Sequence, residues 1–379
     1  MKYTALKDVC EINMGQSPDS SSYNGDGRGI PFFQGNADFG DRNPVTRVWC
    51  DAPTKIANKN DILISVRAPI GAVNYATETC CIGRGLAAIT PDLNKVTSDY
   101  MFWLLKGKNT ELNSKGTGST FKAINRKALE EIQVPDISFE KQSAYATNLE
   151  TAYRVIQMRK QQLSALDDLI KARFVETFGD PVKNEKRWLT KSLEEICRTI
   201  VDCPHSTPNY TYENTGFMCI RTSIVKKNRI LWDEIEFIPE EEYIQRIQRK
   251  KPEKGDIVYT REGAILGIAA IIDRDCNVAL GQRSMLLSPN RNYCTSEFLS
   301  VAMNFDAFLD TALKGMSGSA SPHINVGDIK AFQMILPPID QQKAFSALVA
   351  QIDKSKSAIQ KSLDETQLLF DSLMQKYFG

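Results

Sequence analysis

The sequence predicts a mixed α/β (α+β) protein in which two strand-rich globular domains are separated by an antiparallel pair of long helices. A long stripe of apolar residues at helical spacing precedes Gly179, and a second version of it ends the chain 200 positions later. The same order of strand-like and polar segments precedes each stripe. The chain is therefore a tandem repeat, with globular domains at 1–137 and 180–338 and helices at 138–179 and 339–379.

The first helix is predicted from the spacing of its apolar residues and from the lack of Pro and internal Gly before its end. Ser138 is the expected N-cap, with Glu140 in the first turn, and Gly179 followed by Pro181 is a stop signal. The apolar stripe consists of Leu149, Ala152, Tyr153, Ile156, Leu163, Leu166, Ile170, Phe174 and Phe178.

The second helix repeats this stripe position by position. The corresponding pairs are Leu149 and Val349, Ala152 and Ile352, Leu163 and Leu363, Ile170 and Phe370, and Phe178 and Phe378. Neither helix can bury its stripe alone, so each is the simplest partner of the other. Because the ends of a domain usually lie close together, we expect the pair to be antiparallel, with one globular domain at each end. Roughly 38 residues give a rod of about 57 Å.

The first globular domain is predicted in order along the chain. A short packing element comes first, and a segment that leads into the long helix comes last. Between them lie polar loops, strands and one buried helix. The segments are the packing element 6–12, the loop 15–29, the strands 30–36, 62–67 and 82–91, the helix 100–106, the loop 115–120 and the lead-in 132–135.

The second globular domain repeats this frame. The segment 193–197 matches the first packing element, 255–261 matches the strand that ends at Arg67, and 280–289 matches 82–91. An apolar segment at 298–308 takes the place of the buried helix, and 315–319 that of the Gly-Ser loop. Loops between these anchors differ in length and residue type, so one scaffold is expected to carry two different binding surfaces.

Composition excludes several classes of protein. The longest strongly apolar run, 265–272, is too short to span a bilayer, and no targeting signal is visible, so we expect a soluble, cytoplasmic protein. Nine cysteines, an odd number without regular spacing, argue against a disulfide framework. The net charge of +1 says little about partners, because a nucleic-acid binder with this balance must concentrate its basic groups locally.

Candidate base-reading residues lie where predicted strands end. The arginines are Arg67, Arg84, Arg221, Arg261 and Arg283, and the amides are Gln34, Asn36 and Gln282. An arginine fork can bond guanine O6 and N7, and an amide can address adenine. A surface ion pair or a phosphate contact is the alternative for each one singly. Because such residues recur at corresponding places in both halves, DNA contact is favoured for the group as a whole.

The Gly-Ser loops supply further candidates. GTGST at 116–120 lacks the full spacing of a nucleotide-binding loop, so polar contacts to DNA and plain structural turns remain as its two interpretations. The candidates are Lys115, Thr117, Ser119 and Lys122 in the first half, and Ser317, Ser319, His323 and Asn325 in the second. The basic run 246–254 fits either a solvated helix end or a phosphate track.

Metal and catalytic sites are disfavoured. Cys197, Cys203 and His205 match no common zinc spacing, and Cys197 and its equivalent Cys10 are predicted core residues. His205 and His323, the two histidines, come with no nucleophile constellation, and no dinucleotide or methyl-donor motif is present. We therefore expect a non-catalytic chain that binds neither metal nor cofactor.

The layout resembles the specificity (S) subunit of type I restriction-modification systems over essentially the whole chain. The resemblance rests on NDILISVRAPIG and GDIVYTREGAILG, on IQVPDISFEKQ and ILPPIDQQK before the helices, and on helix ends at 178–179 and 378–379. One departure is the segment 138–142, which is less like the family's usual proline-rich, Glu-Gln helix start than its second copy is.

This resemblance implies two target recognition domains, each reading one half of a bipartite DNA site, and helices that set the spacing. It also implies two modification subunits that use S-adenosylmethionine and restriction subunits that use ATP, with Mg²⁺, so that the chemistry resides in partners. Leu169, Val175, Leu368 and Leu369 either dock the modification subunits or pack within the helix pair. The alternative function is a protein-interaction scaffold with two binding modules on a coiled-coil spacer.

Overall fold

The computed structural model describes residues 2–117, 122–313 and 323–379, and the chain divides into two compact units. The first unit comprises Met1–Lys160 and Lys361–Gly379, and the second comprises Gln161–Gln360. Each unit therefore contains one globular part together with a portion of both long helices. The predicted loop residues Ser119, Ser317 and Ser319 lie outside the described residues.

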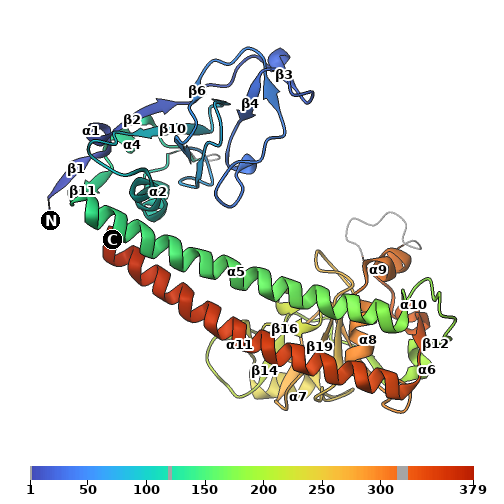
Figure 1. Ribbon diagram of the computed structural model, residues 1–379. Helices are drawn as coiled ribbons and strands as arrows, with labels where there is room; N and C mark the ends of the chain where they lie inside the picture. Colours follow the sequence, from blue (N-terminus) through green and yellow to red (C-terminus); the bar gives the residue numbers. More distant parts are fainter. Residues whose placement is uncertain (1, 118–121, 314–322) are drawn as a thin grey trace. The chain divides into compact units, whose positions relative to one another are not determined.

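The first unit contains a four-stranded antiparallel sheet of order β2-β10-β7-β8 (Figure 1). Strand β1 and the short helix α1 precede this sheet in the chain, and β11, which pairs with β1, follows it. The bounds are β1 Tyr3–Ala5, α1 Leu6–Val9, β2 Cys10–Met14, β7 Ile62–Ser65, β8 Val73–Tyr75, β10 Leu86–Pro91 and β11 Gln133–Pro135.

A five-stranded mixed sheet of order β3-β5-β4-β9-β6 completes the strands of this unit, and its β4 and β9 are parallel. Its bounds are β3 Tyr23–Asn24, β4 Ile30–Phe33, β5 Trp49–Cys50, β6 Ile56–Ala57 and β9 Cys80–Ile82. The helices are η1 Ser20–Ser22, η2 Asn36–Asp38, α2 Ser98–Gly107, α3 Asn109–Ser114 and α4 Arg126–Glu130. As predicted, α2 is buried over residues 100–105.

The second unit repeats the four-stranded sheet as β13-β21-β18-β19, with β12 paired to β22 as β1 is to β11. A three-stranded sheet, β17-β14-β20, and the pair β15-β16 replace the five-stranded sheet. The bounds are β12 Leu189–Ser192, β13 Cys197–Asp202, β14 Met218–Ile220, β15 Val225–Lys226, β16 Arg229–Ile230, β17 Glu236–Phe237, β18 Ile257–Thr260, β19 Ala269–Ile271, β20 Val278–Leu280, β21 Ser284–Pro289 and β22 Gln333–Leu336. The helices are α6 Leu193–Ile196, η3 Thr222–Ile224, η4 Trp232–Glu234, α7 Glu240–Arg246, α8 Ser296–Met303, α9 Asp306–Leu313 and α10 Val326–Ala331.

Two kinds of predicted element were wrong in their extent. The strands expected at 82–91 and 280–289 are each two strands, which belong to different sheets and are separated by a turn at 83–85 and at 281–283. The turn is possible because Gly85 and Gly281 bring the backbone closer to a neighbouring segment than a side chain would allow. The helix expected at 298–308 is likewise broken, into α8 and α9.

Both long helices have the predicted extent: α5 is Phe139–Phe178 and α11 is Ile339–Phe378, each of 40 residues. The amide of Lys141 bonds the Ser138 hydroxyl at 3.4 Å, which confirms the predicted N-cap. Gly179 has φ +80°, a left-handed conformation that favours glycine after a helix end.

The two helices run antiparallel within each unit, as predicted (Figure 1). In the first unit Tyr145 stacks on Tyr377 at 3.7 Å between ring centroids, and Arg159 donates to the Ser362 carbonyl. In the second unit the sequence order of the partners is again reversed. Asp167 there pairs with Lys356, and Phe174 lies 5.6 Å from Phe345.

A buried glutamine near the start of each helix ties it to its globular part. The Gln142 side chain accepts from the Thr97 amide at 2.8 Å and donates to the carbonyls of Lys95 and Ile137. The Gln342 side chain repeats this pattern, accepting from the Thr295 amide and donating to two carbonyls, those of Tyr293 and Pro337. Each glutamine thus satisfies three backbone groups that the fold would otherwise bury unpaired.

We predict that Gln342→Leu destabilises the protein by about 2 kcal/mol or more, because it leaves one amide and two carbonyls without partners. Gln341→Leu is the matched control, since its side chain is the exposed neighbour of the buried Gln342. Thermal and urea unfolding of the two variants should differ. Equal stability would show that the buried amide makes no net contribution.

Candidate nucleic-acid interface

In each unit, polar side chains gather at the carboxyl ends of a pair of parallel strands. Strands β4 and β9 pair through Phe33 and Ile82, and β14 and β20 pair through Ile220 and Leu280. Because parallel strands end at the same edge of a sheet, the residues that follow them lie together. We call Gln34 and Arg84 the first edge, and Arg221 and Gln282 the second edge.

The two edges carry the same residue types on exchanged strands. Gln34 follows β4 and Arg84 lies two residues after β9, whereas Arg221 follows β14, the equivalent of β4, and Gln282 lies two residues after β20. The equivalence rests on matching bonds: the Gly83 amide donates to Phe33 and the Gly281 amide to Ile220, each at 2.8 Å. One frame therefore presents an arginine and a glutamine twice, in opposite order.

The backbone around the first edge is held by side chains from nearby loops. The carboxylate of Asp38 accepts from the amides of Gln34 at 2.7 Å and Gly35 at 3.3 Å. The hydroxyl of Ser17 accepts from the Arg84 amide at 3.2 Å. Gln34 and Arg84 are themselves exposed. A Cβ on Gly85 would come within 2.4 Å of the Gln34 carbonyl, so glycine is required there.

Three more predicted residues lie beside the first edge. The amide of Val66 donates to the Gly85 carbonyl at 2.9 Å, which places the exposed Arg67 next to the edge. Arg67 and Thr117 each form a β-bridge with Ala123, and Lys122 precedes that residue. The structure therefore brings Arg67, Thr117 and Lys122 together with the first edge.

Two further first-half candidates have local roles. Asn36 begins η2 and is half-buried. Lys115, at the end of α3, pairs with Glu111 at 2.7 Å, and this bond together with the charge of Lys115 helps to hold the pKa of the Glu111 carboxyl below its usual value. Lys115 is therefore bound within its own helix.

The second edge is held more firmly than the first. Nη1 of Arg221 donates to both carboxylate oxygens of Glu236, at 2.6 and 2.7 Å, and Glu236 is 8% exposed. The guanidinium lies 4.8 Å from the Tyr210 ring centroid, and the bond to Glu236 raises the pKa of Arg221. Gln282 donates to the Thr207 hydroxyl at 3.1 Å.

The expectation that Arg261 corresponds to Arg67 was wrong. The Arg261 amide donates to Arg283 as the Val66 amide does to Gly85, and Glu262 bridges His323 as Arg67 bridges Ala123. Arg261 is thus the equivalent of Val66, and a one-residue shift along a strand turns a side chain to the opposite face. Arg261 is 6% exposed and donates to both oxygens of Asp202, at 2.9 and 3.1 Å.

The remaining second-half candidates are exposed. Arg283 has φ +70°, at the position that Gly85 occupies in the first unit. His323 bridges Glu262 in the backbone, and Asn325 donates to Asp328 at 3.0 Å before α10. Arg283 directly follows Gln282 of the second edge, and its carbonyl accepts from the Arg261 amide.

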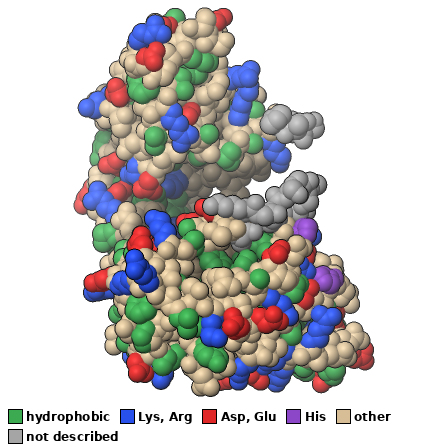
Figure 2. Space-filling view, turned by 90° about the vertical axis from the view of Figure 1, so that its right-hand side faces the viewer, with side chains coloured by type: hydrophobic (Ala, Val, Ile, Leu, Met, Phe, Trp, Pro, Cys, Tyr) green, Lys and Arg blue, Asp and Glu red, His purple; other side chains and the backbone are tan. Residues whose placement is uncertain are grey.

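The basic run 246–254 is neither a uniform solvated end nor a continuous basic track. Arg246 is buried and donates to Glu242 and to the carbonyls of Leu280 and Ser206, directly behind the second edge. Lys250 pairs with Glu253 and Asp256. On the face shown in Figure 2, basic and acidic side chains are interspersed, in line with the net charge of +1.

The predicted core role of the repeated cysteines is confirmed. Cys10 and Cys197 follow α1 and α6 and are 6% and 9% exposed, and burial raises the pKa of each thiol to about 12.

His205 pairs with Asp202 at 3.1 Å. Within residues 2–117, 122–313 and 323–379, no group of three or more His, Cys, Asp or Glu side chains is arranged to hold a metal. In the same ranges, no helix is long and apolar enough to cross a membrane.

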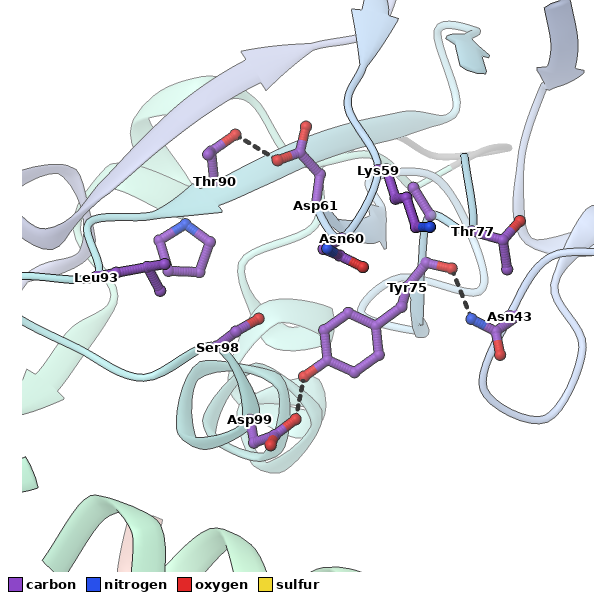
Figure 3. A pocket seen from close by; sticks show the side chains of 12 residues that line it. Asn43, Lys59, Asn60, Asp61, Tyr75, Thr77, Thr90, Leu93, Ser98 and Asp99 are labelled. Carbon is purple, nitrogen blue, oxygen red and sulfur yellow. Dashed lines mark hydrogen bonds between the residues drawn. The ribbon is translucent and has the colours of Figure 1, made fainter. Parts of the chain in front are cut away.

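A cavity of about 690 Å³ in the first unit lies apart from the predicted residues (Figure 3). Tyr75 donates to Asp99 at 3.0 Å and Thr90 donates to the buried Asp61 at 2.7 Å. The second oxygen of Asp61 accepts from the Asn58 amide, and the repeat equivalent of Asp61, Asp256, makes the same kind of bond to Glu253. The Asp61 carboxylate therefore stabilises a repeated turn.

The model of the type I restriction modification DNA specificity domain matches this chain twice, at residues 1–167 and 185–366. The chain belongs to this family. The putative type I restriction enzyme MjaX specificity subunit of Methanocaldococcus jannaschii is 41% identical over 157 residues, covering 41% of this chain and 37% of that protein. The MjaIX specificity subunit of the same organism is 24% identical and covers 98% of this chain and 91% of its own length.

A solved structure shares the fold of this specificity-family chain along its whole length. The type I restriction-modification system S subunit from M. genitalium matches with a TM-score of 0.62 at 15% identity, covering 100% of this chain and 96% of the other. At this identity the likeness shows the fold alone. It confirms the predicted mixed α/β architecture. The match to the family model confirms the predicted family.

Sequence reasoning missed the residues that support the second edge. Strand β17, which carries Glu236, pairs antiparallel with β14 as β5 pairs with β4. The repeats differ in residue type at these places, so the repeat gave no signal for Glu236, Tyr210 or Arg246. Only the spacing of Glu242 and Arg246, four residues apart on α7, pointed to an ion pair.

Proposed function

We propose that this chain is the DNA sequence-recognition subunit of a type I restriction-modification complex in the cytoplasm. Its two globular parts are target recognition domains, and each reads one half of a bipartite DNA site. Family membership supports this proposal. The methyltransferase and endonuclease activities reside in partner subunits, so this chain is not itself an enzyme.

One observation carries the proposal beyond the family: the same frame presents an arginine and a glutamine twice, on exchanged strands. A duplicated scaffold with two equal edges would fit a symmetric ligand. Two unequal edges fit two different half-sequences, because arginine and glutamine address different bases. The predicted residues beside the first edge, Arg67, Thr117 and Lys122, then provide phosphate or base contacts.

We predict that the purified chain binds duplex DNA with strong salt dependence. Phosphate contacts release counterions, so about five such contacts give a slope of roughly −4 to −5 in log K against log salt concentration. Fluorescence anisotropy with a labelled duplex measures this slope. A flat response would support a protein-interaction scaffold instead.

The helix pair would set the distance between the two half-sites. Each 40-residue helix is about 60 Å long at about 1.5 Å per residue, which equals roughly 18 base-pair steps. Spacing is then a property of helix length, and half-site sequence is a property of the edges.

Removing residues 161–167 and 355–361 together should shorten the preferred gap by about 3 base pairs and leave both half-sequences unchanged. Seven residues are about two helical turns, so the apolar stripe stays in phase, and the two segments face each other through Asp167 and Lys356. Methylation of duplexes with different gaps, using the complete complex, measures the preference.

The control for this pair of deletions removes residues 161–167 alone. That single deletion puts the apolar stripe of α5 out of register with the stripe of α11, so it should lower the free energy of unfolding. An unaltered gap preference in the double deletion would contradict the proposal that helix length sets the half-site spacing.

Exposed apolar residues on the helices would dock two modification subunits, which bind S-adenosylmethionine. Restriction subunits, which use ATP and Mg²⁺, complete the complex. In the first unit Leu368 and Leu369 are 70% and 54% exposed, and in the second Leu169 and Val175 are 40% and 42% exposed. Their exposure favours docking over packing within the helix pair.

We predict that replacing Leu368 and Leu369 by Ser reduces co-purification of the modification subunits at least tenfold, because a buried apolar contact is lost. Glu365→Ser, at another exposed position of α11, is the control. Unchanged co-purification of the double variant would eliminate this docking surface.

A further inference from the structure

Arg221 and Arg261 are both ion-paired near the second edge, but they differ in how much of each guanidinium is engaged. The Arg261 side chain is 7% exposed, and Nε and Nη2 both donate to Asp202. The Arg221 side chain is 45% exposed, and its two bonds to described residues both come from Nη1. Nε and Nη2 of Arg221 are therefore left for a partner.

We propose that Arg221 reads one guanine in the half-site bound by the second unit, through Nε and Nη2 of its guanidinium. These two atoms are parallel donors in a fixed plane, and guanine presents two matching acceptors, O6 and N7, in the major groove. This inference rests on the proposed DNA-recognition function and assigns one base to one residue.

Glu236 and Tyr210 hold the guanidinium before DNA arrives. Glu236 lies on β17, directly opposite Cys219 of the antiparallel strand β14, and its buried carboxylate takes both bonds from Nη1. The Tyr210 ring lies 4.8 Å from the guanidinium carbon, and a Cβ on Gly281 would come within 2.7 Å of the Tyr210 hydroxyl oxygen. An arginine fixed in this way loses less conformational freedom on binding than a free one.

The equivalent position of the first unit makes the assignment specific. Gln34 follows β4 as Arg221 follows β14, and no carboxylate bond to its side chain is found among the described residues. A residue needed only to complete the frame would be the same type in both repeats. Arginine here and glutamine there fit positions that read different bases.

The test compares Arg221→Lys with the unaltered chain in the complete complex, using duplexes randomised at each position of both half-sites. Lysine keeps the charge beside Glu236 but lacks the planar pair of donors. We expect discrimination for guanine to fall about tenfold or more at one position of one half-site, with the other half unchanged. Arg229→Lys is the control, because Arg229 is exposed on β16 of the same unit and lies outside the second edge.

A second variant, Glu236→Gln, weakens the interaction that positions the Arg221 guanidinium but keeps Arg221 itself. It should reduce discrimination at the same position by a smaller factor, and it keeps the proposal testable if Arg221→Lys fails to fold. Uniform weakening on all sequences with the salt slope reduced by about one would mean a phosphate contact and overturn the proposal. An unchanged preference in both variants would also overturn it.

These outcomes differ from failure of the proposed function. If the unaltered complex shows no sequence preference on any duplex, DNA recognition itself is contradicted. If it reads a split site and Arg221→Lys reads the same site equally well, only the role of Arg221 is lost.

Discussion

The structure depends on the burial of two apolar stripes against each other, because neither unit is complete without a segment of the other repeat. The first unit includes the last residues of α11: Phe370 packs 5.6 Å from Trp103, and Lys108 donates to the Phe378 carbonyl at 2.8 Å. The second unit includes the end of α5, where Phe174 and Phe178 pack on Phe298. The two repeats are therefore interlocked through their helices.

This interlocking has a functional consequence under the proposed role. A change in one helix alters the core of both units, so its length and register are constrained by packing. The edges lie on strands outside the helices, and the loops behind them differ freely between repeats. The scaffold can thus stay constant while the residues that read DNA change.

Much of the fold could be predicted from sequence because long periodic signals are robust. The stripes around Leu149 and Val349 gave both helices nearly to the residue, and the repeat gave the core role of Cys10 and Cys197. Strand ends were predicted less well, because glycines such as Gly85 let the chain pass from one sheet to another within three residues.

The candidate site could be predicted only in part. Alignment by residue type matched Arg261 to Arg67, but pairing in the sheet decides which face a side chain takes, and Arg261 faces inward. The sequence shows Gln142 and Gln342 at equivalent positions but not their bonding role, since each accepts from an amide of a distant segment. Contacts set by tertiary packing leave little trace in a single sequence.

The most direct test of this account is to sequence methylated positions in a host that makes this chain with its modification subunits. The account predicts one split motif, made of two different half-sequences separated by a constant gap. A single continuous motif, or methylation without any motif, would contradict it.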